Sequence, residues 1–423
     1  MDKRKYRYVV FLLIMICVFS IVVSADMTAR SIGLGDEFVV LEGITGLFSN
    51  PASVDINDNS FALEFTMAGE AWNNVFVNDN ISEADKEKLV KIAGSDGLLI
   101  AANANLGGKM GIGPLVLFTD GKANSLFRVS DDFAELLIRG NEIEGEYLLD
   151  GTDGALAFYL DSGINYSFKI DDKYLDSLRN SFKVKNMYLG ITYHYLRGGF
   201  AKYEADGGFE LGFDEEGDPF VSGNSGKVSA YYTDIDDFKS TAVGHGFDLG
   251  LYADYDDKYS WGFAVLNIGA SLQADTFKEY EYGFEYDEDN DEWNTTEPVD
   301  DGVLKYQEIT MDLPLVIKFG GKMKYSDNLD LFANYTMSSY SDSIYNDSLK
   351  DHRIALALEY TGVDFLPLRT GLNYSTLERD FDIAAGLGLY LGPLKIDVGI
   401  SDLSGLFYRS KGVAGGISLR LEF

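Results

Sequence analysis

Histidines are the residues in this sequence with the widest chemistry, and there are only three: His194, His245 and His352. No two of them have the spacing of metal ligands on one element. His194 and His245 fall inside stretches that alternate between apolar and polar residues, and His352 opens another such stretch. A structural role is therefore favoured over metal binding, and we predict neither a metal site nor a cofactor.

Carboxylates offer a second route to catalysis, because a pair such as Asp248 and Asp254 can supply a general acid and a general base. Lining a wet interior is the favoured alternative for these two residues.

The chain has no G-x-S-x-G nucleophile motif and no phosphate-binding P-loop. Its single cysteine, Cys17, lies near the N-terminus, so the rest of the chain has no disulfide or thiolate site. We predict no catalytic residue and a protein that is not an enzyme.

The first 25 residues predict export. A basic start containing Lys3 and Arg4 precedes an apolar run over Val9–Val23, and Val23-Ser24-Ala25 resembles a cleavage site. A cleaved signal peptide over 1–25 is favoured over an uncleaved anchor, because the run falls short of the roughly 20 residues of a spanning helix.

The chain is strongly acidic, with a net charge of −33 over 423 residues. Removal of the leader, which carries four basic residues and one acidic residue, leaves −36. This charge argues against a nucleic-acid partner, since phosphates repel an acidic surface. The sequence is also rich in Gly (45), Tyr (27) and Phe (28) and poor in Pro (7), which favours a single all-β unit.

Most of the chain after residue 60 alternates with period two, the pattern of strands. In 60–69, for example, Phe61, Leu63, Phe65 and Met67 share one face and Glu64 lies on the other. Most such segments are about 10 to 13 residues long, whereas an ordinary strand has five or six. About ten residues are needed to cross a bilayer at a tilt, which favours a membrane barrel over a soluble sandwich.

The connections between these segments mostly alternate between short and long. Short links are predicted at Gly107–Gly108, Asp256–Asp257, Tyr325–Ser326, Thr361–Phe365 and Gly392, and long links at about 70–96, 119–152, 198–241, 271–304, 339–350 and 402–411. Tight turns at one membrane face and long loops at the other are typical of outer-membrane barrels. This count predicts about fourteen antiparallel strands with both termini on the periplasmic side, or sixteen if 199–235 adds two strands.

The long links hold much of the acid, including the run Asp287–Glu292. A solvated external loop is favoured there over a calcium site, because the run lacks the glycine and the final glutamate of an EF-hand. Residues Glu83–Ala93 predict a short helix within the first long link.

Charged residues recur on the polar face of the predicted strands. They are expected to face a wet lumen because they are costly in lipid. The candidates are Glu64, Asp248, Asp312, Lys318, Asp330, Arg353, Glu359, Arg369 and Arg420.

Two finer expectations concern this face. Asp330 and Arg353 fall on adjacent predicted strands and are expected to pair across the ladder. Pro314 interrupts a strand, which predicts a bulge or, as the less favoured alternative, a side exit through the wall.

Two regions carry a resemblance to a known family. Residues 28–39 read TARSIGLGDEFV, Gly46–Val54 read GLFSNPASV, and similar glycine-rich segments with the final Phe423 occupy 366–423. These resemble the FadL-like outer-membrane proteins, which include long-chain fatty-acid transporters, type IX secretion shuttle proteins and TraF-like barrels.

The resemblance implies a fourteen-stranded barrel over 59–423 whose lumen is plugged by residues 26–58. The plug motif residues would be Arg30, Gly33, Gly35, Asn50, Pro51 and Ala52. In that arrangement the glycines allow close backbone approach, Asn50-Pro51 makes a turn, and Arg30 pairs with a lumen carboxylate. Chain turning is favoured over ligand contact for the glycines and the Asn-Pro-Ala segment. Asp36 and Glu37 stand where the family usually has small residues, which leaves the packing of the plug open there.

The resemblance favours passive transport of a hydrophobic small molecule, such as a fatty acid or hydrocarbon, across a Gram-negative-type outer membrane. The alternative is a barrel scaffold or shuttle in a secretion or conjugation apparatus, which the charged inward face and acidic loops favour. A transporter should have an apolar tunnel from the loops to the plug, and a scaffold a charged, blocked lumen. The expected partners are outer-membrane lipid, a hydrophobic ligand, and the barrel-assembly machinery, which would recognise the C-terminal strand ending at Phe423.

Overall fold

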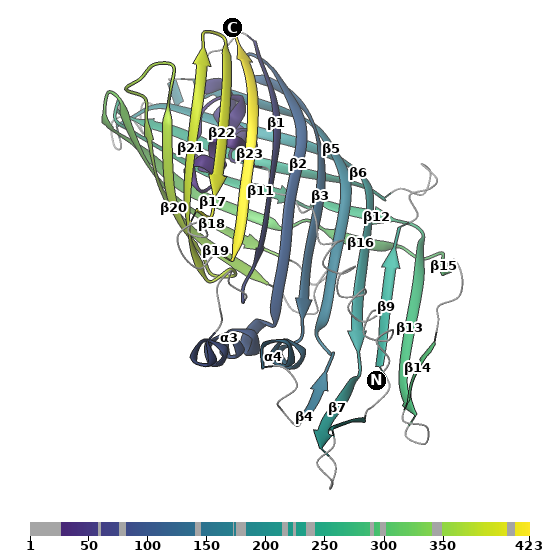
Figure 1. Cartoon of the computed structure of the whole chain (residues 1–423). Helices are drawn as coiled ribbons and strands as arrows, with labels where there is room; N and C mark the ends of the chain where they lie inside the picture. Colours follow the sequence, from purple (N-terminus) through teal and green to yellow (C-terminus); the bar gives the residue numbers. More distant parts are fainter. Residues whose placement is uncertain are drawn as a thin grey trace.

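The computed structural model is a closed antiparallel barrel of fourteen strands (Figure 1). It describes residues 27–57, 61–75, 82–139, 145–171, 173–174, 183–213, 219–222, 226–233, 242–287, 292–296, 302–340, 349–403 and 411–423. The predicted signal peptide, residues 1–25, lies outside this part of the chain. No helix among the described residues is long and apolar enough to cross a membrane.

The barrel closes where the first strand pairs with the last, from Ala62 opposite Glu422 to Trp72 opposite Gly412. Every wall strand is antiparallel to its neighbours, as expected when short turns and long loops alternate. In chain order the wall strands are β1 (Ala62–Asn73), β2 (Leu98–Ile112), β3 (Leu115–Val129), β5 (Thr152–Lys169), β6 (Val184–Asp206), β10 (Ala242–Tyr255), β11 (Tyr259–Ile268), β17 (Leu315–Ser326), β18 (Leu329–Ser339), β19 (Lys350–Tyr360), β20 (Leu368–Ser375), β21 (Asp380–Leu391), β22 (Leu394–Ser401) and β23 (Gly412–Glu422).

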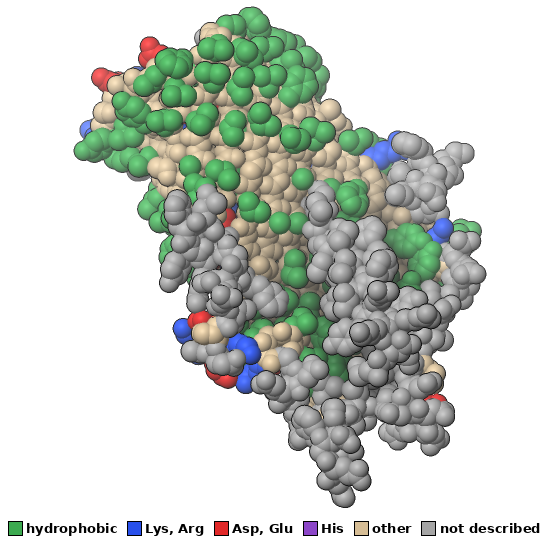
Figure 2. Space-filling model, in the orientation of Figure 1, with side chains coloured by type: hydrophobic (Ala, Val, Ile, Leu, Met, Phe, Trp, Pro, Cys, Tyr) green, Lys and Arg blue, Asp and Glu red, His purple; other side chains and the backbone are tan. Residues whose placement is uncertain are grey.

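The period-two pattern determines which face of each strand meets lipid. Phe65 and Met67 of β1 are 52% and 58% exposed, whereas Glu64 and Thr66, which alternate with them along the strand, are buried. Figure 2 shows hydrophobic side chains spread over the end of the barrel that carries the C-terminus, where the short turns also lie. Exposed apolar area on this scale matches a lipid-facing wall with a polar interior.

The turn predicted at Gly107–Gly108 is wrong. Both glycines lie inside β2, and the chain turns at Gly113-Pro114 instead. Gly107 faces Asp120 across the ladder, and a Cβ at position 107 would lie 1.4 Å from the Asp120 carboxylate. The glycine therefore makes room for a neighbouring side chain inside a strand rather than forming a turn.

The long-loop end carries additional structure. Two helices lie there, and β6 continues beyond the barrel into a sheet extension formed with β9 and β13 (Figure 1). The predicted helix at Glu83–Ala93 is present as α3. These elements are α3 (Glu83–Asp96), α4 (Asp131–Arg139), β4 (Gly145–Leu148), β7 (Gly208–Phe213), β8 (Pro219–Ser222), β9 (Gly226–Tyr232), β12 (Ser271–Ala274), β13 (Phe277–Asp287), β14 (Glu292–Thr296), β15 (Val303–Lys305) and β16 (Ile309–Asp312). The described part of 199–235 holds the outer end of β6 with β9, which extend the wall, and β7 and β8, which form a separate small sheet with β4; the barrel has fourteen strands rather than sixteen.

The wall is interrupted near Pro314, where the sequence predicted a break. β16 ends at Asp312 and β17 begins at Leu315, while on the neighbouring strand β11 ends at Ile268 and β12 begins at Ser271. Two hydrogen bonds bridge the break: the Leu313 N–H donates to the Ala270 carbonyl (2.9 Å), and Asn267 Nδ2 donates to the Pro314 carbonyl (3.0 Å).

Candidate functional site: the plugged lumen

The segment 27–57 folds into the barrel as three short helices: α2 (Ala29–Leu34), η1 (Ile44–Gly46) and η2 (Pro51–Asn57). Thr28 caps α2 in a reciprocal capping box with Ser31, and Gly35 ends it with φ +84°. This φ lies in the left-handed region, which explains the need for glycine at position 35.

The plug lies against wall strands at glycine positions. A Cβ at Gly33 would lie 2.7 Å from the Gly386 Cα, and a Cβ at Gly371 would lie 1.7 Å from the Leu34 carbonyl oxygen. Gly250 and Gly262 similarly leave room for Asn50. The family motif predicted the glycines of the plug, but sequence reasoning missed the wall glycines against which the plug packs. Glycines on the lumen face of several neighbouring strands were the available signal.

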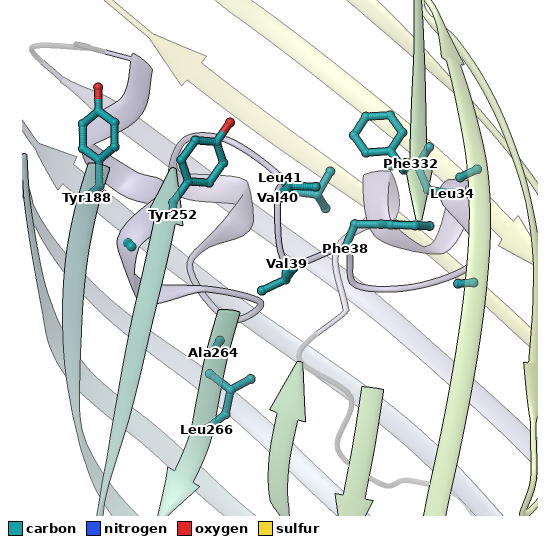
Figure 3. Close-up of a cluster of buried hydrophobic side chains, with 13 residues drawn as sticks. Leu34, Phe38, Val39, Val40, Leu41, Tyr188, Tyr252, Ala264, Leu266 and Phe332 are labelled. Atoms are coloured by element: carbon teal, nitrogen blue, oxygen red, sulfur yellow. The ribbon is translucent and has the colours of Figure 1, made fainter. Parts of the chain in front are cut away.

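Between α2 and η1 the plug buries an apolar stretch, Phe38–Leu41, against the wall (Figure 3). Phe38 lies against Phe332 with ring centroids 5.5 Å apart, and all four residues of the stretch are buried. Apolar packing of this kind stabilises the seat of the plug in proportion to the area removed from water.

The Asn-Pro-Ala segment is tied to the wall by hydrogen bonds. Asn50 Nδ2 donates to the carbonyls of Val39 (2.9 Å) and Leu251 (3.0 Å), and its Oδ1 accepts from the Ala52 N–H (3.0 Å). Asn165 Nδ2 of β5 donates to the Pro51 carbonyl (3.1 Å). These bonds satisfy buried backbone carbonyls, so the segment fixes the plug in place.

The acidic residues that depart from the family pattern have wall partners. Glu37 pairs with Lys318 at 2.5 Å, and Asp36 accepts from Asn334 Nδ2 at 2.8 Å. Glu42 pairs with Lys322 and accepts from the Tyr252 hydroxyl. These contacts show how a plug with Asp36 and Glu37 still packs on this wall.

Glu42 is also a titratable link between plug and wall. Burial disfavours its charged form, but Lys322 outweighs burial and, with Tyr252, lowers the pKa of the Glu42 carboxyl below its usual value. The charged form of Glu42 therefore favours the seated plug.

A network of ion pairs joins α2 to the wall on the other side of the lumen. Arg30 pairs with Glu359 at 2.6 Å, which is the kind of contact predicted for Arg30. Arg369 pairs with Glu359 at 2.6 Å and with Asp397 at 2.7 Å. All the charges of this group lie in mutual contact, as buried charges must.

The network continues to the strands that close the barrel. Arg420 of β23 lies 3.8 Å from Asp397 and 3.5 Å from Glu64 of β1, and Lys109 pairs with Glu64 at 2.9 Å. Thr45 of the plug donates to Glu64 at 2.8 Å. One chain of alternating charges therefore spans plug, first strand and last strand.

His194 lies in a second buried chain that the sequence did not reveal. Its Nδ1 lies 3.0 Å from Asp161 and its Nε2 2.8 Å from Asp248, and Lys122 pairs with Asp161 at 2.6 Å. The four strands involved, β3, β5, β6 and β10, are successive neighbours in the wall. The available signal was the polar face of β6, where Thr192 and His194 alternate with aromatic residues.

Beyond the plug, towards the long loops, the lumen holds a cavity of about 240 Å³. One flank carries the apolar residues Trp72, Ala101, Leu126, Ala155, Tyr159 and Ala414, interspersed with Asn103, Lys122, Asn124 and Ser125. Met27, Ile32 and Gly35 of the plug line the same cavity, whereas Arg30 and Asn50 are not among its lining residues. The cavity thus rests directly on the plug.

The remaining flank of the cavity is charged. Its acidic residues on the wall are Glu70, Asp312, Asp351, Glu378, Asp382 and Asp402. Arg353 of β19 lies among them and pairs with Glu378 and, at 3.9 Å, with Asp351.

A family model described as "Family of unknown function (DUF5723)" matches residues 44–400. The chain belongs to this family. No curated protein matches the DUF5723 chain at a significant level.

Solved structures similar to this DUF5723 barrel share its whole architecture. The Ralstonia pickettii toluene transporter TbuX is 12% identical, with a TM-score of 0.55 and coverage of 96% of this chain and 100% of that one. The CymD monoaromatic hydrocarbon channel is 10% identical (TM-score 0.53; 94% and 97% covered), and a Pseudomonas aeruginosa FadL homologue is 13% identical (TM-score 0.51; 95% and 99% covered). The predicted fold is confirmed: the chain folds as a closed fourteen-stranded barrel with an N-terminal plug, the fold that it shares with these solved structures.

The structure separates the lumen-facing charges predicted from sequence into groups. Glu64, Glu359, Arg369 and Arg420 lie in the network around α2, Asp248 contacts His194, Lys318 holds Glu37, and Asp312 and Arg353 line the cavity. The predicted pairing of Asp330 with Arg353 is wrong. Asp330 lies opposite Glu359 and Lys324, and Arg353 lies opposite Thr336, because the ladder is shifted by six residues from the register that pairing needs.

Proposed function

We propose that this DUF5723 barrel is a passive outer-membrane channel for a small hydrophobic molecule, exported by the signal peptide over 1–25. The observation that carries the proposal is the cavity on the loop side of the plug. It has an apolar flank and is floored by α2, so a molecule that enters from outside meets the plug next. Its volume, about 240 Å³, is close to the lower end of ordinary ligand pockets.

The protein acts by binding and passage rather than by catalysis. In support, the solved barrels with the same fold include a toluene transporter, a monoaromatic hydrocarbon channel and a FadL homologue. The plug would then act as the barrier, and its displacement or rearrangement would open the way to the periplasm.

Filling the cavity tests this proposal. Ala101 of β2 faces the lumen and is buried, whereas Ala104, three residues further along the same strand, faces outward. We expect Ala101→Trp to reduce uptake of radiolabelled toluene into cells that express the barrel, and the matched Ala104→Trp to leave it unchanged. Equal uptake by wild type, both variants and cells without the barrel would refute a channel for hydrophobic molecules.

A scaffold remains the second candidate, and the structure at the long-loop end favours it. α3 and α4 pack together through Leu89, Ala93 and Ala134, and Arg139 of α4 pairs with Glu87 of α3 at 3.1 Å. A barrel that serves as a scaffold requires a folded outer surface on which a partner can dock, and its lumen can stay closed by ion pairs. Absence of uptake, with a protein partner recovered on the intact barrel after cross-linking in cells, would support this function instead.

A further inference from the structure

Phe48 of the plug lies between two buried lysines of the wall. The centroid of its ring is 4.6 Å from Nζ of Lys109 on β2 and 4.9 Å from Nζ of Lys122 on β3. Phe48 is 3% exposed and both lysines are buried, so water is excluded from all three side chains. Both distances lie within the roughly 6 Å over which a cation is attracted to the face of an aromatic ring.

The two lysines belong to the two chains of buried ion pairs described above. Lys109 pairs with Glu64 at 2.9 Å, and Glu64 is part of the network around α2. Lys122 pairs with Asp161 at 2.6 Å, and Asp161 contacts His194. One aromatic ring of the plug therefore touches both chains of charge in the wall.

The position of the Phe48 ring is fixed from the wall and from the plug. Phe118 of β3 meets it edge to face, with ring centroids 5.1 Å apart and an angle of 90° between the planes. Leu47 of the plug belongs to the same buried apolar cluster. Thr45, three residues before Phe48, donates to Glu64 at 2.8 Å. The ring is thus held against the lysines by the surrounding contacts.

Apolar packing alone does not account for an aromatic residue at position 48. A lysine ammonium carries three N–H donors, of which one carboxylate oxygen takes up one. A buried ammonium that faces an aliphatic side chain gains no interaction on that side, although it has lost its water there. The face of a phenyl ring carries partial negative charge, and its attraction for a cation is strongest where water is excluded.

We propose that Phe48 latches the plug to the barrel wall through cation–π contacts with Lys109 and Lys122. Because a single ring makes both contacts, the plug loses them together when it leaves its seat. Phe48 is a positioning residue: it holds the barrier of the barrel in place and does not act on the permeating molecule. The inference goes beyond the proposed function, since it concerns the seating of the plug whatever molecule passes.

Stepwise fluorination of the ring separates a cation–π contact from apolar packing. Phenylalanine with one, two or three ring fluorines is introduced at position 48 of the full chain by amber suppression. Each fluorine withdraws negative charge from the ring face and changes the size of the ring little, so packing is nearly constant along the series.

Seating of the plug is measured as the rate at which a thiol reagent labels Ser53→Cys in the purified barrel. Ser53 is 0% exposed, so labelling requires the plug to leave its seat. Cys17→Ser removes the only native cysteine from the reaction. We expect the labelling rate to rise with each fluorine and to be about tenfold higher with three fluorines, as the loss of a desolvated cation–π contact implies.

The matched control is the same fluorine series at Phe38, a buried plug residue whose ring lies against Phe332. Among the residues that the structure describes, no lysine or arginine lies over the Phe38 ring. The labelling rate should therefore not depend on the number of fluorines at position 38. A flat series at Phe48, or equal slopes at the two positions, would overturn the proposal and leave Phe48 as an apolar packing residue.

A lysine variant tests whether both cations take part. Lys122→Met keeps a long unbranched side chain and removes the ammonium group. It is expected to reduce the dependence on fluorine at Phe48 to about half on a logarithmic scale, because one of the two contacts remains. An unchanged slope would overturn the two-sided contact. The series with both lysines present is decisive even if the Lys122 variant does not fold.

These outcomes are independent of the test of the channel. If labelling rises along the Phe48 series and no toluene enters cells, the latch stands and the channel is refuted. If toluene enters cells and the Phe48 series is flat, the latch is refuted and the channel stands.

Discussion

The two halves of the lumen use the same residue types in opposite ways. Around α2, charged residues are matched: Arg30, Glu359, Arg369 and Asp397 form consecutive ion pairs between plug and wall. Around the cavity above, Glu70, Asp351, Glu378 and Asp382 lie near a single guanidinium, that of Arg353, which pairs with Glu378 and Asp351. Consecutive buried ion pairs hold plug and wall in one arrangement, whereas several carboxylates that share one guanidinium do not tie two elements together in the same way. The comparison separates residues that hold the plug from residues that line the cavity.

Displacing the plug is expected to produce the largest effect. Gly371→Leu places a side chain where the Leu34 carbonyl lies, since even a Cβ would come within 1.7 Å of that oxygen. We expect α2 to leave its seat and the barrel to admit small sugars, measured as the swelling rate of liposomes that contain the protein.

The control for this variant is Gly415→Leu, which adds the same side chain on the outward face, where a Cβ would meet nothing closer than 3.9 Å. It should leave the barrel sealed. If Gly371→Leu folds and remains as tight as the control, then close approach at the glycines is not what seats the plug.

The second-largest effect is expected when the ion pairs between α2 and the wall are broken. Arg369→Ala leaves Glu359 and Asp397 buried with one partner fewer, and loss of one member of a buried network typically costs about 3–5 kcal/mol. Unfolding in urea, followed by circular dichroism in detergent micelles, measures the change. Lys185→Ala breaks an exposed pair with Asp257 at a short turn and should leave the midpoint unaltered. Equal midpoints for the two variants would contradict a structural role for the network.

The sequence predicted the barrel well because lipid imposes a rule that each strand must satisfy by itself. Phe65 and Met67 outward with Glu64 inward require no knowledge of the neighbouring strands. Predicting which side chains pair between strands does require knowledge of the neighbouring strand. Asp330 and Arg353 lie on adjacent strands, yet the register keeps them apart. The same limit hid His194, whose two carboxylate partners come from β5 and β10.

Glycines show a second limit of sequence reasoning. Gly107 and Gly392 look alike in the sequence, but Gly392 forms a turn with φ +63° and Gly107 makes room for Asp120 inside β2. The charged residues of the lumen were predicted as one class for a related reason. The alternation of residues along a strand predicts that a side chain points into the barrel. Whether that side chain has an ion-pair partner depends on the plug and on the register between strands.

A smaller effect is expected from the acid sensitivity of the plug. The pKa of Glu42 lies below its ordinary value of 4.5 in the folded protein, so its contribution to stability is present above about pH 4.5 and is lost as pH falls through the lower folded pKa. Glu42→Gln should therefore differ from wild type in unfolding midpoint at pH 7 and converge with it as the pH falls through the lowered pKa of Glu42. A constant difference across that range would show that the Glu42 charge does not hold the plug to Lys322 and Tyr252.

The smallest effect is expected at Asp330, which has the same lumen parity as Arg369 but lies near a short turn, opposite Lys324 and Glu359. Asp330 is not one of the ion-paired residues around α2. Its carboxylate has a like-charged neighbour, Glu359, as well as an oppositely charged one, Lys324, and the two interactions offset each other. Asp330→Asn should change the free energy of unfolding by about 0.5 kcal/mol or less. Urea midpoints for Asp330→Asn and Arg369→Ala in the same detergent make the comparison direct. If Asp330→Asn lowered the free energy of unfolding as much as Arg369→Ala, then an inward-facing charge would contribute to stability whether or not it belongs to the ion pairs between plug and wall.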